Sequence, residues 1–181
     1  MTTILAIHKD GVSVLGGDGQ VTLGTQVQKT GAVKVRTLQD GRVLAGFAGG
    51  AADALALLER FEAKLEAHAG QLRKSAVELA KDWRTDRVLR RLEAVMVLAD
   101  GDELLLVSGT GDVIAPDEEP GGGGVLGTGS GGAVAAAAAR ALLKHSSLSA
   151  REICEEALKV AAGIDLYTNE HLTLLEVARD A

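Results

Sequence analysis

The fold follows from one stretch near the start of the chain, Ile4-Leu5-Ala6-Ile7-His8-Lys9-Asp10-Gly11-Val12-Ser13-Val14-Leu15-Gly16. Two short runs in it, Ile4–His8 and Val12–Gly16, carry the β-branched and apolar residues that favour strands. Asp10-Gly11 lies between them, and Asp-Gly is a strong signal for a tight hairpin turn. The sequence therefore predicts that the chain begins with an antiparallel β-hairpin.

The same pattern recurs twice farther along the chain. Asp40-Gly41 and Asp100-Gly101 each separate two candidate strands. The two pairs are Val33–Leu38 with Arg42–Phe47, and Ala94–Ala99 with Glu103–Ser108. Single strands are predicted at Asp112–Ala115, Val125–Gly127 and Leu172–Val177, and loops at Gly17–Gly31 and Pro116–Gly124.

Four helices are predicted as two pairs. In the first pair, Leu55, Leu58, Phe61 and Leu65 recur at helical spacing in a helix from Ala51 to His68. Its partner runs from about Arg73 to Arg91, and its candidate buried residues are Val77, Ala80, Trp83 and Val88. The second pair comprises an alanine-rich helix, Ala133–Lys144, and a helix that a Ser149/Glu152 capping box opens and that ends near Ala162.

The order of these elements predicts an α+β fold. Strands do not alternate one for one with helices, which argues against a doubly wound parallel sheet. Antiparallel hairpins with helices added in pairs favour a layered sandwich instead. Because no internal repeat or long linker interrupts the chain, we predict one domain over residues 1–181.

Composition narrows the class of protein. The net charge is −6, which argues against nucleic acid as a partner because phosphate binding needs clustered Lys and Arg. We assign the one basic run, Arg84–Arg91, to a solvated or subunit-contact helix face. No apolar run approaches the roughly 18–20 residues that span a bilayer, and residues 1–9 do not resemble a signal peptide. A single cysteine, Cys154, agrees with a reducing cytoplasm, so we expect a cytoplasmic protein without membrane partners.

Thr2 is the first candidate for chemistry. A hydroxyl is a weak nucleophile unless a base takes its proton, and an N-terminal threonine can use its own α-amine as that base. An α-amine titrates near ~7.7–8.0, so part of it is free at neutral pH. Thr2 follows Met1, and its small side chain permits removal of that methionine. Taken alone, Thr2 is explained more simply as an ordinary residue at the start of a strand.

Asp18 and Lys34 form the second candidate. Asp18 lies in Gly16-Gly17-Asp18-Gly19-Gln20, and Lys34 interrupts an otherwise apolar strand. A cation near an amine base keeps the amine neutral, and a carboxylate can anchor that cation. A turn aspartate and a surface lysine are the plainer alternative.

Two glycine-rich junctions are the remaining candidates. In 45–53, a strand passes through Gly46, Gly49 and Gly50 into a helix, where backbone N–H groups can hold an oxyanion. A tight turn would need the same glycines. In 127–132, Gly127-Thr128-Gly129-Ser130-Gly131-Gly132 matches G-x-G-x-x-G, but the helix after it leads into another helix rather than a strand, unlike a dinucleotide-binding unit.

Together these stretches resemble the HslV (ClpQ) family, bacterial threonine proteases related to proteasome β subunits. Thr-Thr-Ile at the start, Gly-Asp-Gly-Gln, Lys34 and Ala-Gly-Phe-Ala-Gly-Gly stand in the order of that family. The resemblance covers nearly the whole chain. It extends over Ala76–Arg87, Gly129–Gly132, Leu148–Ile153 and Tyr167–Asn169.

The resemblance implies a fold and a set of roles. The fold is that of the N-terminal-nucleophile hydrolases, a four-layer αββα sandwich of two antiparallel sheets between helix pairs. Thr2 would be the nucleophile and, through its amine, the base. Lys34 would activate it, Asp18 would orient Lys34, and Ser130 would bond near the amine. Gly46 is our choice for the oxyanion N–H, with Gly49 and Gly50 nearby.

The resemblance also implies a cofactor and partners. The cofactor is a monovalent cation, sodium, bound through backbone carbonyls at Ala162, Asp165 and Thr168; this chain itself would bind no nucleotide. The partners are copies of the chain in two stacked hexameric rings, the AAA+ unfoldase HslU, and unfolded protein substrates. The loop Glu118–Gly124 is longer and richer in glycine than the family pattern, which bears on the substrate channel or a subunit contact.

Two other functions stay open from the sequence. An inactive structural ring subunit would retain Met1, since a blocked amine cannot act as a base. A dinucleotide-binding protein would use 127–132.

Overall fold

The computed structural model describes residues 2–86, 89, 94–120 and 122–179. Two antiparallel sheets make up its centre, with strand orders β10-β1-β2-β11 (the first sheet) and β5-β6-β7-β8-β9 (the second sheet). The first sheet contains β1 (Thr3–Lys9), β2 (Val12–Gly17), β10 (Gly124–Gly129) and β11 (Thr173–Ala178). The second contains β5 (Val35–Leu38), β6 (Val43–Gly49), β7 (Ala94–Ala99), β8 (Leu104–Ser108) and β9 (Val113–Ile114).

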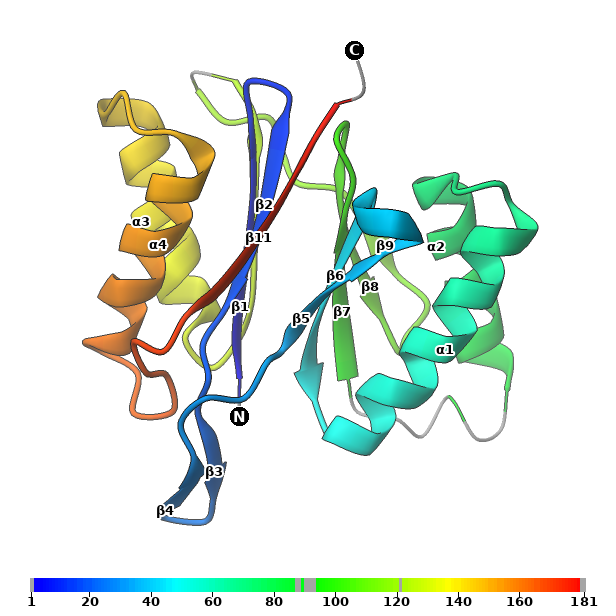
Figure 1. Ribbon diagram of the computed structural model, residues 1–181, viewed down its shortest axis with the longest axis horizontal. Helices are drawn as coiled ribbons and strands as arrows, with labels where there is room; N and C mark the ends of the chain where they lie inside the picture. Colours follow the sequence, from blue (N-terminus) through cyan, green and yellow to red (C-terminus); the bar gives the residue numbers. More distant parts are fainter. Residues whose placement is uncertain (1, 87–88, 90–93, 121, 180–181) are drawn as a thin grey trace.

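Helices cover the outer face of each sheet, so the molecule has four layers (Figure 1). Helices α3 (Gly132–His145) and α4 (Ala150–Ala162) lie on the first sheet, and α1 (Ala51–Ala67) and α2 (Leu72–Thr85) lie on the second. One apolar core separates each helix layer from its sheet, and a third lies between the sheets. The predicted αββα sandwich is confirmed.

Strand β1 lies inside the first sheet and is buried on both faces. Leu5 and Ile7 belong to the core under α3 and α4, whereas Ile4 and Ala6 belong to the core between the sheets. This alternation is the period of two that a strand requires. Burying a side chain of this size contributes about 1.5–3 kcal/mol, so β1 firmly fixes the position of Thr2 just before it.

The first predicted turn is confirmed and the second is wrong in its length. Asp10 and Gly11 both have positive φ, as a two-residue turn between Lys9 and Val12 requires. The second hairpin turns through the 3-10 element η1 (Gln39–Gly41), because Leu38 pairs with Val43 and leaves four residues in the loop. Three consecutive residues there, Gln39 to Gly41, have positive φ.

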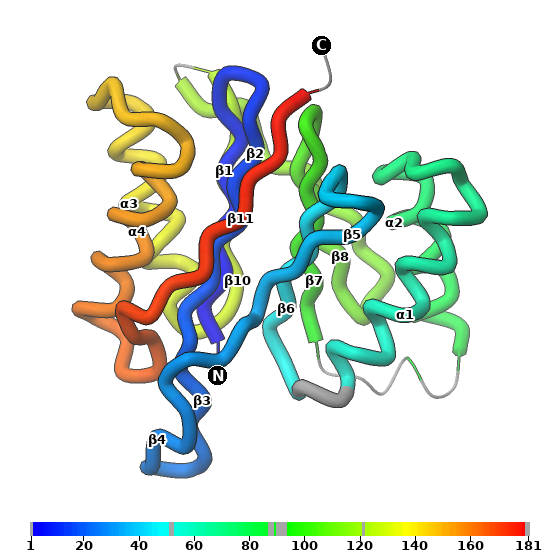
Figure 2. The backbone as a smooth tube through the Cα atoms, in the orientation of Figure 1, coloured from blue at the N-terminus to red at the C-terminus, as the bar shows by residue number. Residues whose placement is uncertain are grey.

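A small hairpin, β3 (Val21–Leu23) with β4 (Gln26–Lys29), occurs where the sequence predicted a loop. Figure 2 shows this β3–β4 hairpin extending beyond the ends of both sheets. Its residues are mostly exposed. The strand runs are too short and too polar for the pattern to separate them from a turn.

Helix α2 is shorter than predicted. It ends at Thr85, and Asp86 already has an extended conformation. Its buried stripe includes Ala76, Ala80 and Trp83, whereas Val77, which we predicted to be buried, lies beside the stripe and is 36% exposed. The predicted helical residues 87, 88, 90 and 91, which include Val88 and three of the four arginines of the basic run, lie outside the described residues.

Among the described residues, no helix is both long enough and apolar enough to cross a membrane.

Candidate active site

Thr2 directly precedes β1, at the end of that strand where Thr3 pairs with Gly129 of β10, and it is 8% exposed. Its carbonyl accepts a hydrogen bond from the Ser130 N–H at 3.0 Å. The next residue, Thr3, donates its N–H to Asp18 Oδ1 at 2.9 Å. Gly129 passes so close that a Cβ there would lie 1.7 Å from the Thr2 carbonyl oxygen, and its φ is +88°. Only glycine can let β10 approach the start of the chain in this way.

Asp18 and Lys34 form a buried ion pair, as the sequence analysis predicted. Lys34 Nζ lies 2.7 Å from Asp18 Oδ1, and their side chains are 9% and 0% exposed. Asp18 Oδ2 accepts the Gln20 N–H at 2.9 Å, and Lys34 Nζ also donates to the Gln20 carbonyl at 2.7 Å. Two of the three ammonium donors are therefore engaged, which leaves one for the cavity described below.

Burial lowers the pKa of Lys34 below its ordinary value of 10.5. The hydrogen bond that Lys34 donates to Asp18, and the negative charges of Asp18 and Asp165, act in the opposite direction and raise this pKa. A lysine with a lowered pKa gives up its proton more readily than a surface lysine. The two carboxylates therefore offset part of the effect of burial on this pKa.

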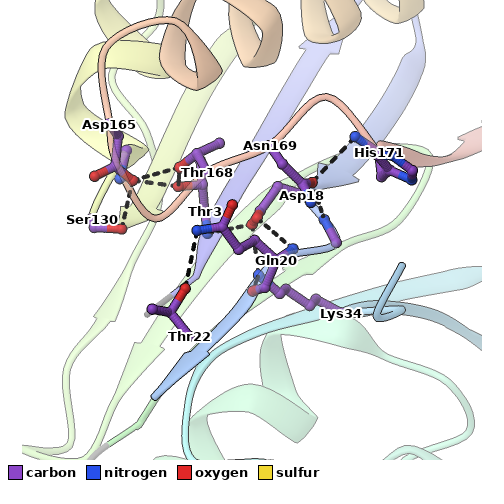
Figure 3. Close-up of polar contacts among 12 residues, drawn as sticks. Thr3, Asp18, Gln20, Thr22, Lys34, Ser130, Asp165, Thr168, Asn169 and His171 are labelled. Atoms are coloured by element: carbon purple, nitrogen blue, oxygen red, sulfur yellow. Dashed lines mark hydrogen bonds and ion pairs between the residues drawn. The ribbon is translucent and has the colours of Figure 1, made fainter. Parts of the chain in front are cut away.

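Asp165 joins Ser130 to Thr168 (Figure 3). Asp165 Oδ2 accepts hydrogen bonds from Ser130 Oγ at 2.7 Å and from Thr168 Oγ1 at 2.5 Å. Since the Thr168 hydroxyl proton points to Asp165, Thr168 Oγ1 accepts the bond from Thr3 Oγ1 at 2.6 Å. Thr3 Oγ1 in turn accepts the Gly131 N–H at 3.0 Å. In this series of bonds, the Thr3 hydroxyl donates to Thr168, and the Thr168 hydroxyl donates to the Asp165 carboxylate.

A cavity of about 270 Å³ opens beside Thr2. Thr2, Lys34 and Gly49 all line it. The rest of the lining is apolar except for Arg36: Val21, Ala32, Val33, Phe47, Ala54, Leu55 and Leu58. Leu55 is 51% exposed, because it faces this cavity rather than the core that holds Leu58, Phe61 and Leu65.

Gly46, our choice for the oxyanion N–H, does not line this cavity. Phe47 donates its N–H toward β5, to the Lys34 carbonyl at 3.3 Å. Because N–H groups alternate between the two edges of a strand, the Gly46 N–H points to β7, where Gly46 pairs with Val97. The Gly49 N–H points to the β5 side of β6, opposite the chain that precedes Val35, the first residue of β5.

The glycines of 127–132 serve close packing. A Cβ on Gly127 would lie 2.3 Å from the Gly132 carbonyl oxygen, and one on Gly131 would lie 2.6 Å from Thr3 Oγ1. The preceding strand, β10, is antiparallel to β1. A dinucleotide-binding unit has a parallel β-α-β arrangement there, so the geometry argues against that alternative.

The described residues of the loop, 118–120 and 122–124, lie far from Thr2 along β1. Gly124 pairs with His8 at one end of β1, whereas Gly129 pairs with Thr3 at the other end. A Cβ on Gly123 would lie 2.1 Å from the His8 carbonyl oxygen, which explains one of the consecutive glycines. The described part of the loop therefore lies at the opposite end of β1 from the cavity.

The proposed cation ligands lie at the last residue of α4, Ala162, and in the bend that follows it, Asp165 and Thr168. Among the described residues, no hydrogen bond ends on the carbonyl of Ala162 or Thr168, and the Asp165 carbonyl accepts one, from the Thr168 N–H at 3.2 Å. Each carbonyl keeps a lone pair, and hard cations prefer such oxygens. No cluster of three or more His, Cys, Asp or Glu side chains suited to a metal occurs in the described part of the chain. The residues fit a cation held by main-chain oxygens.

Sequence reasoning missed three residues that complete the site. Thr3 and Gln20 touch Asp18 through their backbone N–H groups, and Asn169 holds the Gly19 N–H at 3.1 Å. Gln20 and Asn169 belong to quoted motifs, but no spacing in the sequence indicates which backbone atoms they contact.

Comparison with known proteins agrees with this arrangement. The proteasome subunit family matches residues 1–177. The chain is 53% identical to the ATP-dependent protease subunit HslV of Pseudothermotoga lettingae and 58% identical to that of Anaeromyxobacter sp. (strain Fw109-5), each over 97% of both chains. The crystal structure of eukaryotic HslV from Trypanosoma brucei is 44% identical, with a TM-score of 0.91 over 98% of this chain and 99% of that one. The chain therefore belongs to the proteasome subunit family, and within it to the HslV branch.

Proposed function

We propose that this chain is the proteolytic subunit of an ATP-dependent protease and that Thr2, freed by removal of Met1, is its nucleophile. One observation carries the proposal: Thr2 shares a cavity with Lys34, whose ammonium is held by the buried Asp18. The relatives named as ATP-dependent protease subunits support the activity.

The geometry suggests the following course for the reaction. Thr2 Oγ1 attacks the peptide carbonyl carbon while its proton passes to the Thr2 α-amine. The C–N bond then breaks, the leaving amine takes that proton, and an ester to Thr2 remains. The α-amine next takes a proton from water, whose oxygen attacks the ester carbonyl carbon. The bond from that carbon to Thr2 Oγ1 then breaks, and the α-amine returns the proton to Thr2 Oγ1. Lys34, as a nearby cation, lowers the pKa of the α-amine and so keeps more of it free to act as a base.

The Gly49 N–H is better placed than that of Gly46 to hold the oxyanion. Gly49 lines the cavity with Thr2, and its N–H points to the side on which β5 has not yet begun. The Gly46 N–H is directed into the β6–β7 pairing. Losing one such donor typically costs ~10²–10³ in turnover.

The mostly apolar lining of the cavity favours substrates that have an apolar side chain next to the cleaved bond. The charged residues among its described lining, Lys34 and Arg36, are cations, which repel a substrate lysine. A covalent probe with leucine before its reactive group is expected to label Thr2 about 10-fold faster than one with lysine.

Labelling also tests the nucleophile. Intact mass gives the fraction of chains without Met1, and this fraction is expected to equal the fraction that a threonine-directed covalent probe can modify. Peptide mapping should place the adduct on Thr2. Labelling of chains that retain Met1, or an adduct on another residue, would show that the α-amine mechanism is wrong.

We further propose that the chain works in two stacked hexameric rings with an HslU-type ATPase. Exposed apolar side chains on the β3–β4 hairpin and on the bend after α4, Leu23, Val27, Ile164 and Leu166, support contacts that bury them. ATP would act on the partner, which would deliver unfolded polypeptide. A stable monomer in sedimentation would contradict the ring.

We also propose that the bend at Ala162, Asp165 and Thr168 binds sodium. An ion that binds only the folded state raises the free energy of unfolding by about 1.4 kcal/mol for each tenfold rise in ion concentration above the Kd. Tm is therefore expected to rise with sodium chloride and not with choline chloride at equal ionic strength. Equal effects of the two salts would rule out a specific site.

A further inference from the structure

Asn169 joins three segments of chain close to Asp18 (Figure 3). Its Oδ1 accepts the Gly19 N–H at 3.1 Å and the His171 N–H at 3.2 Å. Its Nδ2 donates to the Thr30 carbonyl at 2.9 Å. Gly19 precedes the β3–β4 hairpin and Thr30 follows it, so one carboxamide bonds to both ends of that hairpin.

Gly19 is packed closely between the other two segments. A Cβ on Gly19 would lie 2.3 Å from the Thr30 carbonyl oxygen and 3.0 Å from that of His171. Gly19 is buried, and its own carbonyl accepts the Ala32 N–H at 2.9 Å. Without Asn169, the Gly19 N–H loses its partner, and a buried donor left unpaired costs free energy.

The segments that Asn169 joins carry the ion pair of the site. Asp18 precedes Gly19, and Gln20, which follows it, supplies the carbonyl that accepts from Lys34. Lys34 itself follows Thr30 by four residues. A shift between the two ends of the hairpin would therefore move the Lys34 ammonium relative to Asp18 and Thr2.

We propose that Asn169 is a positioning residue for the hydrolysis, one that sets the place of the Lys34 ammonium by fixing Gly19 against Thr30. The inference rests on the proposed role of Thr2 and Lys34. Asn169 does not line the cavity beside Thr2, so its effect passes through these two segments.

Asn169→Ala tests the inference in the assembled full chain with a fluorogenic peptide. We expect kcat to fall about 10–100-fold, because a misplacement of about 1 Å can cost 10²-fold, while KM changes less than about threefold. The acidic limb of the kcat/KM pH profile should move to higher pH, since a more distant cation lowers the pKa of the Thr2 α-amine less. Asn169→Asp keeps the acceptor for Gly19 and loses the donor to Thr30, so its kcat should fall between those of wild type and Asn169→Ala.

His171→Ala is the matched control. It lies on the same segment, its side chain is exposed, and its backbone N–H still bonds to Asn169, so kcat and pH profile should stay at wild-type values. An Asn169→Ala variant with wild-type kcat would overturn the inference. So would a lower kcat with an unshifted acidic limb, which indicates a purely structural role. Failure of the wild type to cleave, or to be labelled at Thr2, would instead overturn the proposed function.

Discussion

Replacing Thr2 with alanine is expected to lower peptide hydrolysis on the order of 10⁴-fold or more, the loss typical of removing a nucleophile that acts with its base. The variant keeps an α-amine at residue 2 but has no hydroxyl to attack the substrate. Its β1 strand should be unchanged, because the packing of Ile4 to Ile7 does not involve the Thr2 side chain. The measurement is kcat/KM on a fluorogenic peptide, with the assembly checked by sedimentation.

Two variants show whether the loss comes from the hydroxyl. Thr2→Ser retains a hydroxyl and an α-amine, so it should keep measurable turnover and be labelled by the covalent probe. Thr25→Ala removes an exposed threonine from the β3–β4 hairpin and should match wild type. Turnover of Thr2→Ala at a tenth of the wild-type rate would rule out Thr2 as the nucleophile.

The fold could be predicted because its signals are local. The Asp10-Gly11 turn and the alternation along β1 lie within a few residues of each other, and they determine the first hairpin without reference to the rest of the chain. The β3–β4 hairpin could not be predicted in this way. Its ends are held by Gln20, which donates to the Leu166 carbonyl, and by Asn169, partners that lie 146 and 139 residues from their contacts.

Some residues of the candidate site could likewise be predicted from the sequence, and others could not. Thr2, Asp18 and Lys34 lie close together in sequence and in the order of a known family, so the sequence indicates them as a group. The role of the Asp165 carboxylate depends on Ser130, 35 residues away, and the Thr3–Thr168 bond joins residues 165 apart. Only the packing of β10 and the bend after α4 against β1 brings these hydroxyls together. Gly46 and Gly49 differ in which edge of β6 their N–H groups face, and this depends on the register with β5.

Replacing Lys34 with methionine is expected to lower kcat about 10²–10⁴-fold, the range for groups that assist proton transfer. Without the cation, the pKa of the Thr2 α-amine should rise toward ~7.7–8.0, so less free amine is present at neutral pH. The acidic limb of kcat/KM should therefore move to higher pH, in the direction expected for Asn169→Ala but farther. The pH profile of each variant on the same peptide measures this.

The free energy of unfolding distinguishes the structural role of the Lys34 charge from its role in the reaction. Lys34→Met leaves the fully buried Asp18 without its cation, and breaking a buried pair costs about 3–5 kcal/mol of unfolding free energy. The double variant Asp18→Asn/Lys34→Met removes both charges, so it should recover part of that free energy in urea unfolding but none of the lost kcat. Lys29→Ala, a change of an exposed lysine on β4, should leave both quantities unchanged. If the double variant regained turnover along with stability, Lys34 would be a structural residue, because a group that acts on the α-amine cannot be replaced by an uncharged one.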